Sequence, residues 1–188
     1  NIFETPDLHH EHDLMILDKE LCLIIEAKAS PPIEPFRDPE RAFVRLRHAF
    51  RADTGIQKAY EQAIRLLHRL RKGESVTLYN EKGEVVAQVP HAMADRTFCV
   101  CVTRDNYGPL ATNLALLLEK EDEEPYPWAI NVLDLEMLGE AWNYFGWGTK
   151  ELLEYLCHRI RSHGKVFSDD ELDFAGYYVK HGSLEHAL

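Results

Sequence analysis

The stretch that decides the fold covers residues 13–28 and reads DLMILDKELCLIIEAK. It contains two apolar runs of strand length, Leu14–Leu17 and Leu21–Ile25, with the polar residues 18–20 between them. Two short apolar runs around a polar turn are typical of an antiparallel β-hairpin. We therefore expect a hairpin here, with charged residues at its open end.

Those charged residues have a spacing that matters. Glu26 and Lys28 are two residues apart in one strand and so point to the same face. With a four-residue loop and Leu17 opposite Cys22, the register places Asp13 across from Glu26, with Cβ atoms about 4.5–5.5 Å apart. A shift by one residue would turn Asp13 to the other face. The sequence thus predicts Asp13, Glu26 and Lys28 together on one face.

Such a group of charges predicts metal chemistry. Two adjacent carboxylates repel each other unless a cation neutralises them, and oxygen ligands favour Mg²⁺ or Mn²⁺ over Zn²⁺. The Lys28 ammonium can orient an attacking water or stabilise charge on a phosphate. The pattern therefore predicts phosphodiester hydrolysis. The alternative is that Asp13 and Lys28 are ordinary strand-end charges in water.

The residues Asp13 and Glu26-Ala27-Lys28 on a hairpin, followed by a glutamine-bearing helix, resemble the PD-(D/E)xK superfamily of restriction-endonuclease-like nucleases. The run 25–29 is most similar to its NERD-type and related nuclease-like branches. The resemblance covers about the first 65 residues. It implies that Asp13 and Glu26 are metal ligands, with the Ala27 carbonyl as another, and that Lys28 is the catalytic lysine.

The N-terminal segment departs from that family. His12 stands where the family usually has a proline. Many members also take a glutamate from a helix before the hairpin, but only twelve residues precede Asp13. Either Glu4 or Glu11 replaces it, or the helix is missing. Because the chain begins at Asn1 rather than methionine, we expect a fragment, a processed product or an unlisted start.

Two helices are predicted after the hairpin. Asp38 is the expected N-cap of a helix over Pro39–Arg51, with proline at its first position. Asp53 or Thr54 is expected to start a second helix that continues to Lys72 and ends at a glycine. The apolar stripe of this second helix is Ile56, Tyr60, Ala63, Leu67 and Leu70.

Gln57 and Gln62 lie on the borders of that stripe, where side chains can reach a neighbouring site. Since a glutamine on this helix commonly lies near the metal in the family, the resemblance implies a catalytic role for Gln62. Gln57 is the reserve candidate, and Gln57 and Arg65 are candidate substrate-binding residues. The alternative is that glutamine simply suits a half-exposed helical position.

The rest of the chain predicts an α/β fold. Segments 76–79 and 84–89 indicate a second hairpin, and 97–103 and 128–133 indicate buried strands. A crossover helix over Pro109–Lys120 makes the buried strands parallel. Asp134 is the expected cap of a helix that reaches about Tyr144. The C-terminal tail predicts helices over 149–162 and, after a capping box at 168–171, to about Lys180.

We thus expect a central mixed β-sheet that carries the hairpin site, flanked by helices. Residues 1–146 form the predicted nuclease domain, N-terminally incomplete if the upstream helix is missing, and residues 147–188 a helical extension packed on it. No apolar run reaches the roughly 18 residues of a membrane span, and no signal peptide is visible, so we expect a cytoplasmic protein. The cysteines indicate buried thiols: Cys22, Cys99, Cys101 and Cys157. His9, His10 and His12 indicate an exposed histidine cluster.

The net charge of −11 opposes strong general DNA binding. Basic residues nevertheless crowd residues 37–72. This segment is either a basic face for nucleic acid or a solvated helix face. Two function classes follow. One is a Mg²⁺- or Mn²⁺-dependent endonuclease that acts on DNA, in phage defence, restriction or repair, alone, as a homo-oligomer or with a basic partner subunit. The other is an inactive nuclease-like module for nucleic-acid binding or complex assembly.

Overall fold

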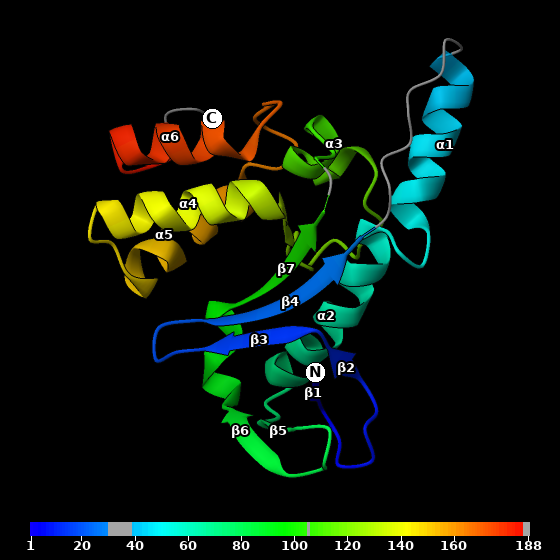
Figure 1. The fold of residues 1–188 in the computed structure, drawn as a ribbon, viewed down its shortest axis with the longest axis vertical. Coiled ribbons are helices and arrows are strands. Elements are labelled where there is room, and N and C mark those ends of the chain that lie inside the picture. Colours follow the sequence, from blue (N-terminus) through cyan, green and yellow to red (C-terminus); the bar gives the residue numbers. More distant parts are fainter. Residues whose placement is uncertain (30–38, 105, 186–188) are drawn as a thin grey trace.

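The computed structural model describes residues 1–29, 39–104 and 106–185. The expected α/β class is confirmed, with helices and strands interspersed along the chain (Figure 1). In chain order the elements are β1 (Ile2–Phe3), β2 (Glu11–His12), β3 (Leu14–Leu17), β4 (Cys22–Lys28), α1 (Pro39–Arg51), α2 (Ile56–Arg71), β5 (Val76–Tyr79), β6 (Val85–Val89), the 3₁₀ helix η1 (His91–Arg96), β7 (Thr97–Thr103), α3 (Pro109–Thr112), the 3₁₀ helix η2 (Leu114–Leu116), β8 (Trp128–Asn131), α4 (Val132–Tyr144), α5 (Thr149–Arg161) and α6 (Glu171–His181).

The strands form two four-stranded sheets. The mixed sheet has the order β3-β4-β7-β8, in which β4, β7 and β8 are parallel and the edge strand β3 is antiparallel to β4. The second sheet, β2-β1-β5-β6, is antiparallel and joins the N-terminal strands to the second predicted hairpin. The predicted mixed sheet and its parallel unit are thus present, and a smaller sheet lies below it (Figure 1).

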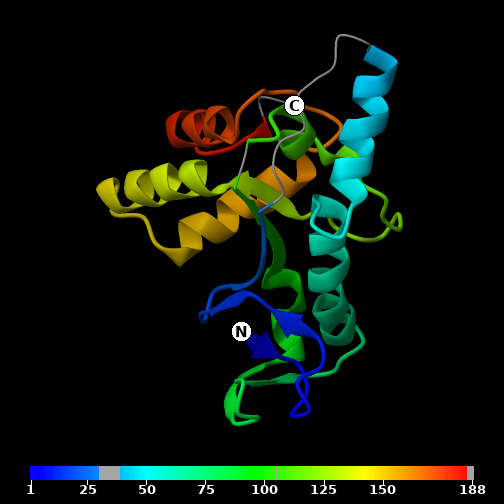
Figure 2. The ribbon, with the colours of Figure 1, turned by 45° about the vertical axis from the view of Figure 1, so that its right-hand side comes forward.

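Strand β4 is apolar on both faces because each face packs on helices. Leu23 and Ile25 belong to the core shared with α4, α5 and α6, whereas Cys22 and Ile24 belong to the core shared with α2. Figure 2 shows these helices on opposite sides of the sheet. Successive strand residues point to opposite faces, so a strand covered on both sides needs a continuous apolar run.

The two helices after the hairpin follow the sequence closely. Helix α1 has the predicted bounds, although its expected cap, Asp38, lies outside the described residues. The predicted α2 stripe is buried throughout. The predicted start of α2 at Asp53 or Thr54 is wrong, because Gly55 is the N-cap. A Cβ at Gly55 would lie 2.3 Å from the carbonyl oxygen of Phe50, so only glycine fits where α1 meets α2.

The predicted crossover helix is the largest error in secondary structure. Only α3 and the short η2 form, because the helix ends at Asn113, whose backbone is non-helical. The buried Asn113 Oδ1 accepts the Gly164 N–H (2.8 Å), and His163 Nδ1 accepts the Leu114 N–H (3.1 Å). The Leu114 N–H, which a continuing helix would have bonded within itself, is therefore bonded to the distant His163 side chain, and the Asn113 side chain bonds the loop after α5.

Two further helix starts differ from the predictions. Strand β8 ends at Asn131, whose side chain accepts the N–H groups of Leu133 and Asp134 and so caps α4. Asp134 is therefore not the cap. Helix α6 is capped by Asp170, which accepts the Leu172 N–H, rather than by the expected residue 168.

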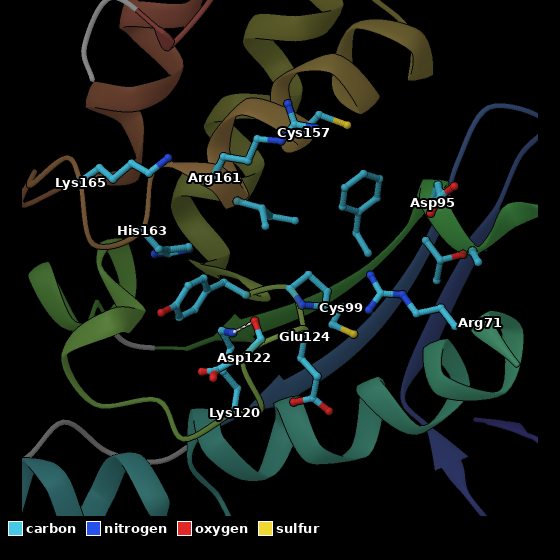
Figure 3. Close-up of a pocket in the computed structure, with 16 residues that line it drawn as sticks. Arg71, Asp95, Cys99, Lys120, Asp122, Glu124, Cys157, Arg161, His163 and Lys165 are labelled. Atoms are coloured by element: carbon cyan, nitrogen blue, oxygen red, sulfur yellow. Dashed lines mark hydrogen bonds between the residues drawn. The ribbon is translucent and has the colours of Figure 1, made fainter.

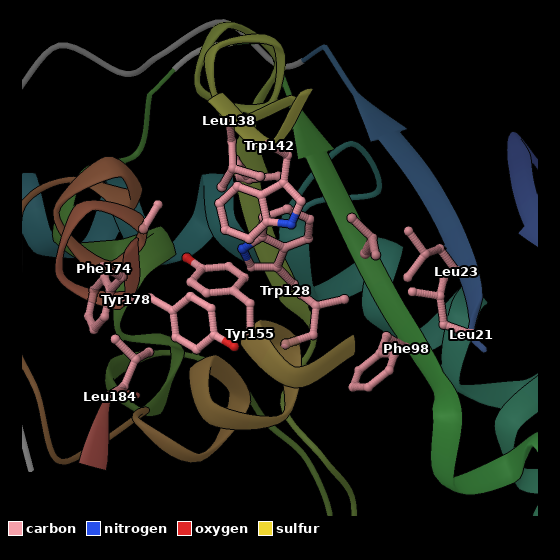
Figure 4. Packing of buried hydrophobic residues seen from close by; sticks show 14 of the residues in the cluster. Leu21, Leu23, Phe98, Trp128, Leu138, Trp142, Tyr155, Phe174, Tyr178 and Leu184 are labelled. Carbon is pink, nitrogen blue, oxygen red and sulfur yellow. The ribbon is translucent and has the colours of Figure 1, made fainter. Parts of the chain in front are cut away.

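The C-terminal helices share the core of the mixed sheet. Trp128 of β8 contacts Tyr155 of α5 edge-to-face, and Tyr155 contacts Tyr178 of α6 in the same way (Figure 4). The expected buried thiols are confirmed for Cys22, Cys99 and Cys101, while Cys157 is half-buried. Burial raises the pKa of Cys22 to about 11.

None of the helices in the described ranges is long and apolar enough to cross a membrane.

Candidate functional site

The hairpin has the predicted register. Leu17 pairs with Cys22 and Leu14 with Ile25. The Asp18 N–H donates to the Leu21 carbonyl (3.0 Å), which closes the four-residue loop. The predicted geometry of the hairpin is therefore confirmed over the four residue pairs of β3 and β4.

Asp13 lies one residue beyond the last of these pairs. The ladder ends at Leu14, so Asp13 and Glu26 are not a paired position of the sheet. Instead, Asp13 Oδ2 accepts the N–H of Ala27 at 2.8 Å. Asp13 is exposed, and this hydrogen bond holds its carboxylate beside the residue that follows Glu26.

Lys28 contacts the helix residue that the resemblance implied. Lys28 Nζ donates to Gln62 Oε1 at 2.8 Å, and both side chains are half-buried. Gln57 has another partner, since its Oε1 accepts the Glu119 N–H and its Nε2 donates to the Glu119 carbonyl, both at 2.9 Å. Of the two glutamines, Gln62 is therefore the one bonded to Lys28.

Arg65 lies on α2 three residues after Gln62 and is half-buried. Its Nε atom is buried and lacks a hydrogen-bond partner within the described part of the chain.

Glu26 belongs to a buried polar chain that the sequence did not indicate. Its Oε1 lies 2.7 Å from His12 Nδ1, and His12 Nε2 lies 3.0 Å from Glu4 Oε1. The other Glu4 oxygen accepts from Arg69 Nη1 at 2.9 Å. Glu4, His12 and Glu26 are 4%, 0% and 2% exposed. The expectation of an exposed His12 is therefore wrong, whereas His9 and His10 are exposed.

The position of His12 explains why it is buried. It lies in β2, which pairs with β1, and this brings its ring between Glu4 and Glu26. Glu4, one of two candidates for the upstream glutamate, thus reaches Glu26 through a histidine. Glu11 is exposed and hydrogen-bonds to Asn1. The sequence feature that could have indicated the burial of His12 is its position, which is usually a proline in the nuclease superfamily that the hairpin resembles.

The charged side chains of this buried polar group stabilise one another. Burial disfavours the charged form of His12, but its hydrogen bonds to Glu26 and Glu4 outweigh burial and raise its pKa. Burial likewise opposes ionisation of Glu4, yet the hydrogen bonds from His12 and Arg69 lower its pKa. These directions favour an imidazolium at His12 and a carboxylate at Glu4.

Replacement of His12 by alanine is expected to destabilise the fold by about 3 kcal/mol, because two buried carboxylates lose their shared cation. Urea denaturation monitored by circular dichroism measures this change. His9→Ala is the matched control, since His9 is exposed and should change stability by less than about 0.5 kcal/mol. Equal stability of the two variants would contradict the proposed charge balance.

The oxygen atoms at the hairpin suit a hard divalent cation. Asp13 bonds through Oδ2 and Glu26 through Oε1, so within the described ranges each carboxylate keeps one oxygen without a hydrogen bond. No group of three His, Cys, Asp or Glu side chains in the described ranges could hold a metal ion. Two carboxylates are nevertheless the usual protein contribution to a Mg²⁺ site, where waters and substrate phosphates complete the shell.

Many of the basic residues after the hairpin are bonded within the molecule. Arg51 pairs with Glu119, and His68 Nε2 lies 2.6 Å from Glu124 Oε1. Arg69 contacts Glu74 as well as Glu4. The predicted basic face is therefore partly neutralised by acidic side chains.

A separate cleft of about 480 Å³ lies at the other end of the mixed sheet (Figure 3). It is lined by Thr97, where β7 begins, whereas Lys28 pairs with Thr103, where β7 ends. Both basic and acidic side chains line it, including Arg161 and Asp95. The cleft is thus distinct from the hairpin site.

His163 lines this cleft and is 6% exposed. Burial, together with the nearby Arg159 cation, lowers its pKa to about 3. An unfolded histidine has a pKa of about 6.5, so the unfolded chain binds a proton below that pH while the folded chain does not. The stability contributed by neutral His163 is therefore present above about pH 6.5 and is lost as the pH falls towards 3.

His163→Gln is expected to remove this acid sensitivity. Between pH 7 and pH 4 the wild-type protein should lose about 3 kcal/mol more stability than the variant. Glutamine can still accept the Leu114 N–H, which makes the comparison a test of charge. Denaturation curves at several pH values measure the difference, and parallel losses in both proteins would refute it.

The chain matches no protein-family model, no curated protein and no solved structure with which it was compared.

Proposed function

We propose that this protein is a divalent-metal-dependent endonuclease that hydrolyses phosphodiester bonds of DNA. The observation that carries the proposal is the hydrogen bond from Lys28 Nζ to Gln62 Oε1 next to the Asp13–Ala27 contact. These contacts join the end of β4, the start of β3 and α2 at one site. Phage defence, restriction and repair are the processes that such an activity fits.

Asp13, Glu26 and the Ala27 carbonyl would hold Mg²⁺ or Mn²⁺. The bound ion supplies polarisation of the phosphoryl oxygen and compensation of its developing negative charge. The His12 hydrogen bond occupies one Glu26 oxygen and directs the carboxylate, so the second oxygen is available as a ligand. A hydrogen bond of this kind, made to a ligand by a residue that does not itself touch the metal, orients the ligating side chain.

Hydrolysis joins a water oxygen to phosphorus and breaks the bond to the leaving oxygen, which takes up a proton. Lys28 directs its ammonium at the attacking water or at the charge that grows on the phosphate. Gln62 accepts one of the three ammonium protons and so fixes the direction of the other two. Gln62 is thus a positioning residue for Lys28.

With a net charge of −11, the protein needs a local group of positive charges to hold DNA at the site. Phosphate binding needs local positive charge, which Arg65, three residues after Gln62, can supply beside the site. A second copy or a basic partner subunit would supply more. Binding should weaken steeply as salt rises.

The test is cleavage of plasmid and single-stranded DNA in Mg²⁺, in Mn²⁺ and in EDTA, beside the variant Glu26→Gln. We expect cleavage by the wild type that needs the metal and is lost in the variant. Calorimetric titration with Mn²⁺ should show binding to the wild type and none to Glu26→Gln. Cleavage that persists in EDTA would contradict the proposal.

The second candidate is a nuclease-like module that binds nucleic acid or assembles a complex without cleavage. The acidic composition and the engagement of Glu26 by His12 favour it. A folded protein that binds DNA, but does not bind Mn²⁺ and does not cleave DNA, would establish this candidate and overturn the first.

A further inference from the structure

Helix α4 carries large apolar side chains on the face that points away from the core. Its inner face packs on the mixed sheet and the C-terminal helices through Leu138 and Trp142. Leu133, Met137 and Tyr144 are nevertheless 65%, 59% and 84% exposed. Their spacing places them in one stripe along the opposite side of the helix. A surface helix usually has a single apolar stripe, so the second stripe indicates a surface that another molecule covers.

The charged residues of α4 are all acidic: Asp134, Glu136 and Glu140. Glu140 lies in the exposed stripe, three residues after Met137 and four before Tyr144. It is exposed and makes no hydrogen bond or ion pair with any described residue. A molecule that covers this face must therefore combine apolar side chains with positive charge.

Helix α1 has these complementary properties. Phe43 and Val44 are 55% and 64% exposed. The helix contains four arginines and one glutamate, which give it a net charge of +3 with histidine neutral. Arg51 is paired with Glu119, but the exposed Arg47, one turn after Phe43, has no hydrogen bond or ion pair with any described residue. Both helices have 13 residues, so each offers a surface about 20 Å long.

Within one chain these two surfaces do not meet. Figures 1 and 2 both show α1 and α4 on opposite sides of the molecule, with α3 between them. Phe50 anchors α1 in a core cluster with residues of α2 and α3, whereas Trp142 anchors α4 in the cluster that includes α5 and α6. A contact between the two surfaces therefore needs two molecules.

We propose that α1 of one copy of this chain docks on the exposed stripe of α4 of a second copy. Contact of Phe43 and Val44 with the stripe removes apolar surface of both helices from water, and Arg47 meets Glu140. Two α4 stripes would pair less well, because their glutamates would face each other. The two surfaces that meet are different, so the contact is heterologous and either closes a dimer or continues head to tail.

Light scattering at increasing protein concentration tests the proposal. One helix pair is a small interface, so we expect masses above that of a single chain only above about 10–100 µM. Arg47→Glu and Glu140→Lys should each weaken association at least about tenfold, because each places like charges opposite each other. Lys82→Glu and Glu20→Lys make the same charge changes in exposed turns and should leave association unchanged. Circular dichroism checks that every variant is folded.

An equal mixture of Arg47→Glu and Glu140→Lys shows whether the contact joins two copies. The first variant keeps an intact α4 and the second an intact α1, so the mixture should associate although neither variant does so alone. A wild-type protein that stays monomeric at the highest concentration would overturn the proposal. So would association that survives in either variant, or a mixture that stays monomeric, because another partner or another surface would then be involved.

Discussion

Replacing Lys28 with alanine is expected to lower the rate of metal-dependent DNA cleavage at least about 100-fold while metal binding persists. In the proposed mechanism the ammonium orients the attacking water or stabilises the charge that grows on the phosphate, so alanine would leave the proposed metal ligands without that help. Single-turnover cleavage of a labelled duplex measures the rate, and Mn²⁺ titration measures binding. The two measurements distinguish the role of Lys28 from that of Glu26. Replacement of Lys28 should lower cleavage alone, whereas replacement of Glu26 should abolish metal binding as well.

Two comparisons make the Lys28 result specific. Lys19 lies in the exposed turn of the same hairpin, and Lys19→Ala should keep full activity. Gln62→Ala should lower the rate by about tenfold with little change in metal affinity, because it frees the ammonium without removing it. Cleavage by Lys28→Ala at the wild-type rate would remove the lysine from the mechanism.

Replacing Arg159 with methionine is expected to destabilise the protein by about 3–5 kcal/mol, the usual cost of leaving a buried carboxylate without its cation. Arg159 is fully buried and its Nη2 lies 2.8 Å from Glu171 Oε2. Its Nη2 also donates to the Thr112 carbonyl and its Nη1 to Ser162 Oγ. One side chain thus ties α5 to α3, α6 and the loop after α5.

The partner of Arg159 provides the internal check. Glu171 Oε1 also accepts from Trp128 Nε1 and from the Tyr155 hydroxyl. Glutamine can accept both hydrogen bonds without a charge, so Arg159→Met combined with Glu171→Gln should cost less than Arg159→Met alone. Arg161→Met, at an exposed position two residues away, should change stability by less than about 0.5 kcal/mol. Chemical denaturation of the wild type, Arg159→Met, the double variant and Arg161→Met measures these differences. A double variant no more stable than Arg159→Met would show that charge burial is not the cause.

The sequence predicted the hairpin and α2 well because local patterns determine both. The apolar runs and the turn set the register of β3 and β4, and the apolar stripe set the buried face of α2. Lys28 and Gln62 are 34 residues apart in the sequence. They meet because α2 covers one face of β4, so the polar end of β4 lies against that helix. Their hydrogen bond is a finding of the structure, and the catalytic role of each residue stays a prediction.

Other features depended on distant side chains that no local pattern reveals. The break at Asn113 accompanies its bond to Gly164, and the burial of His12 follows from two carboxylates, Glu4 just after β1 and Glu26 in β4. Glu171 looked like part of a capping box, but it turns inward to Arg159. In each case a polar side chain satisfies a partner far away in the sequence, and local propensity gives no measure of that gain.

The edge position of β3 has a consequence for the hairpin site. This strand has one neighbour and four paired residues, and Leu14, Ile16 and Leu17 are 51%, 43% and 39% exposed. Asp13 lies between β3 and the buried His12 of β2, and its Oδ2 accepts the Ala27 N–H. Short, exposed edge strands open at a small fraction of the free energy of global unfolding. Local opening of β3 would therefore release residues on one side of Asp13, while the fully buried His12, whose Nδ1 lies 2.7 Å from Glu26 Oε1, still anchors the chain on its other side.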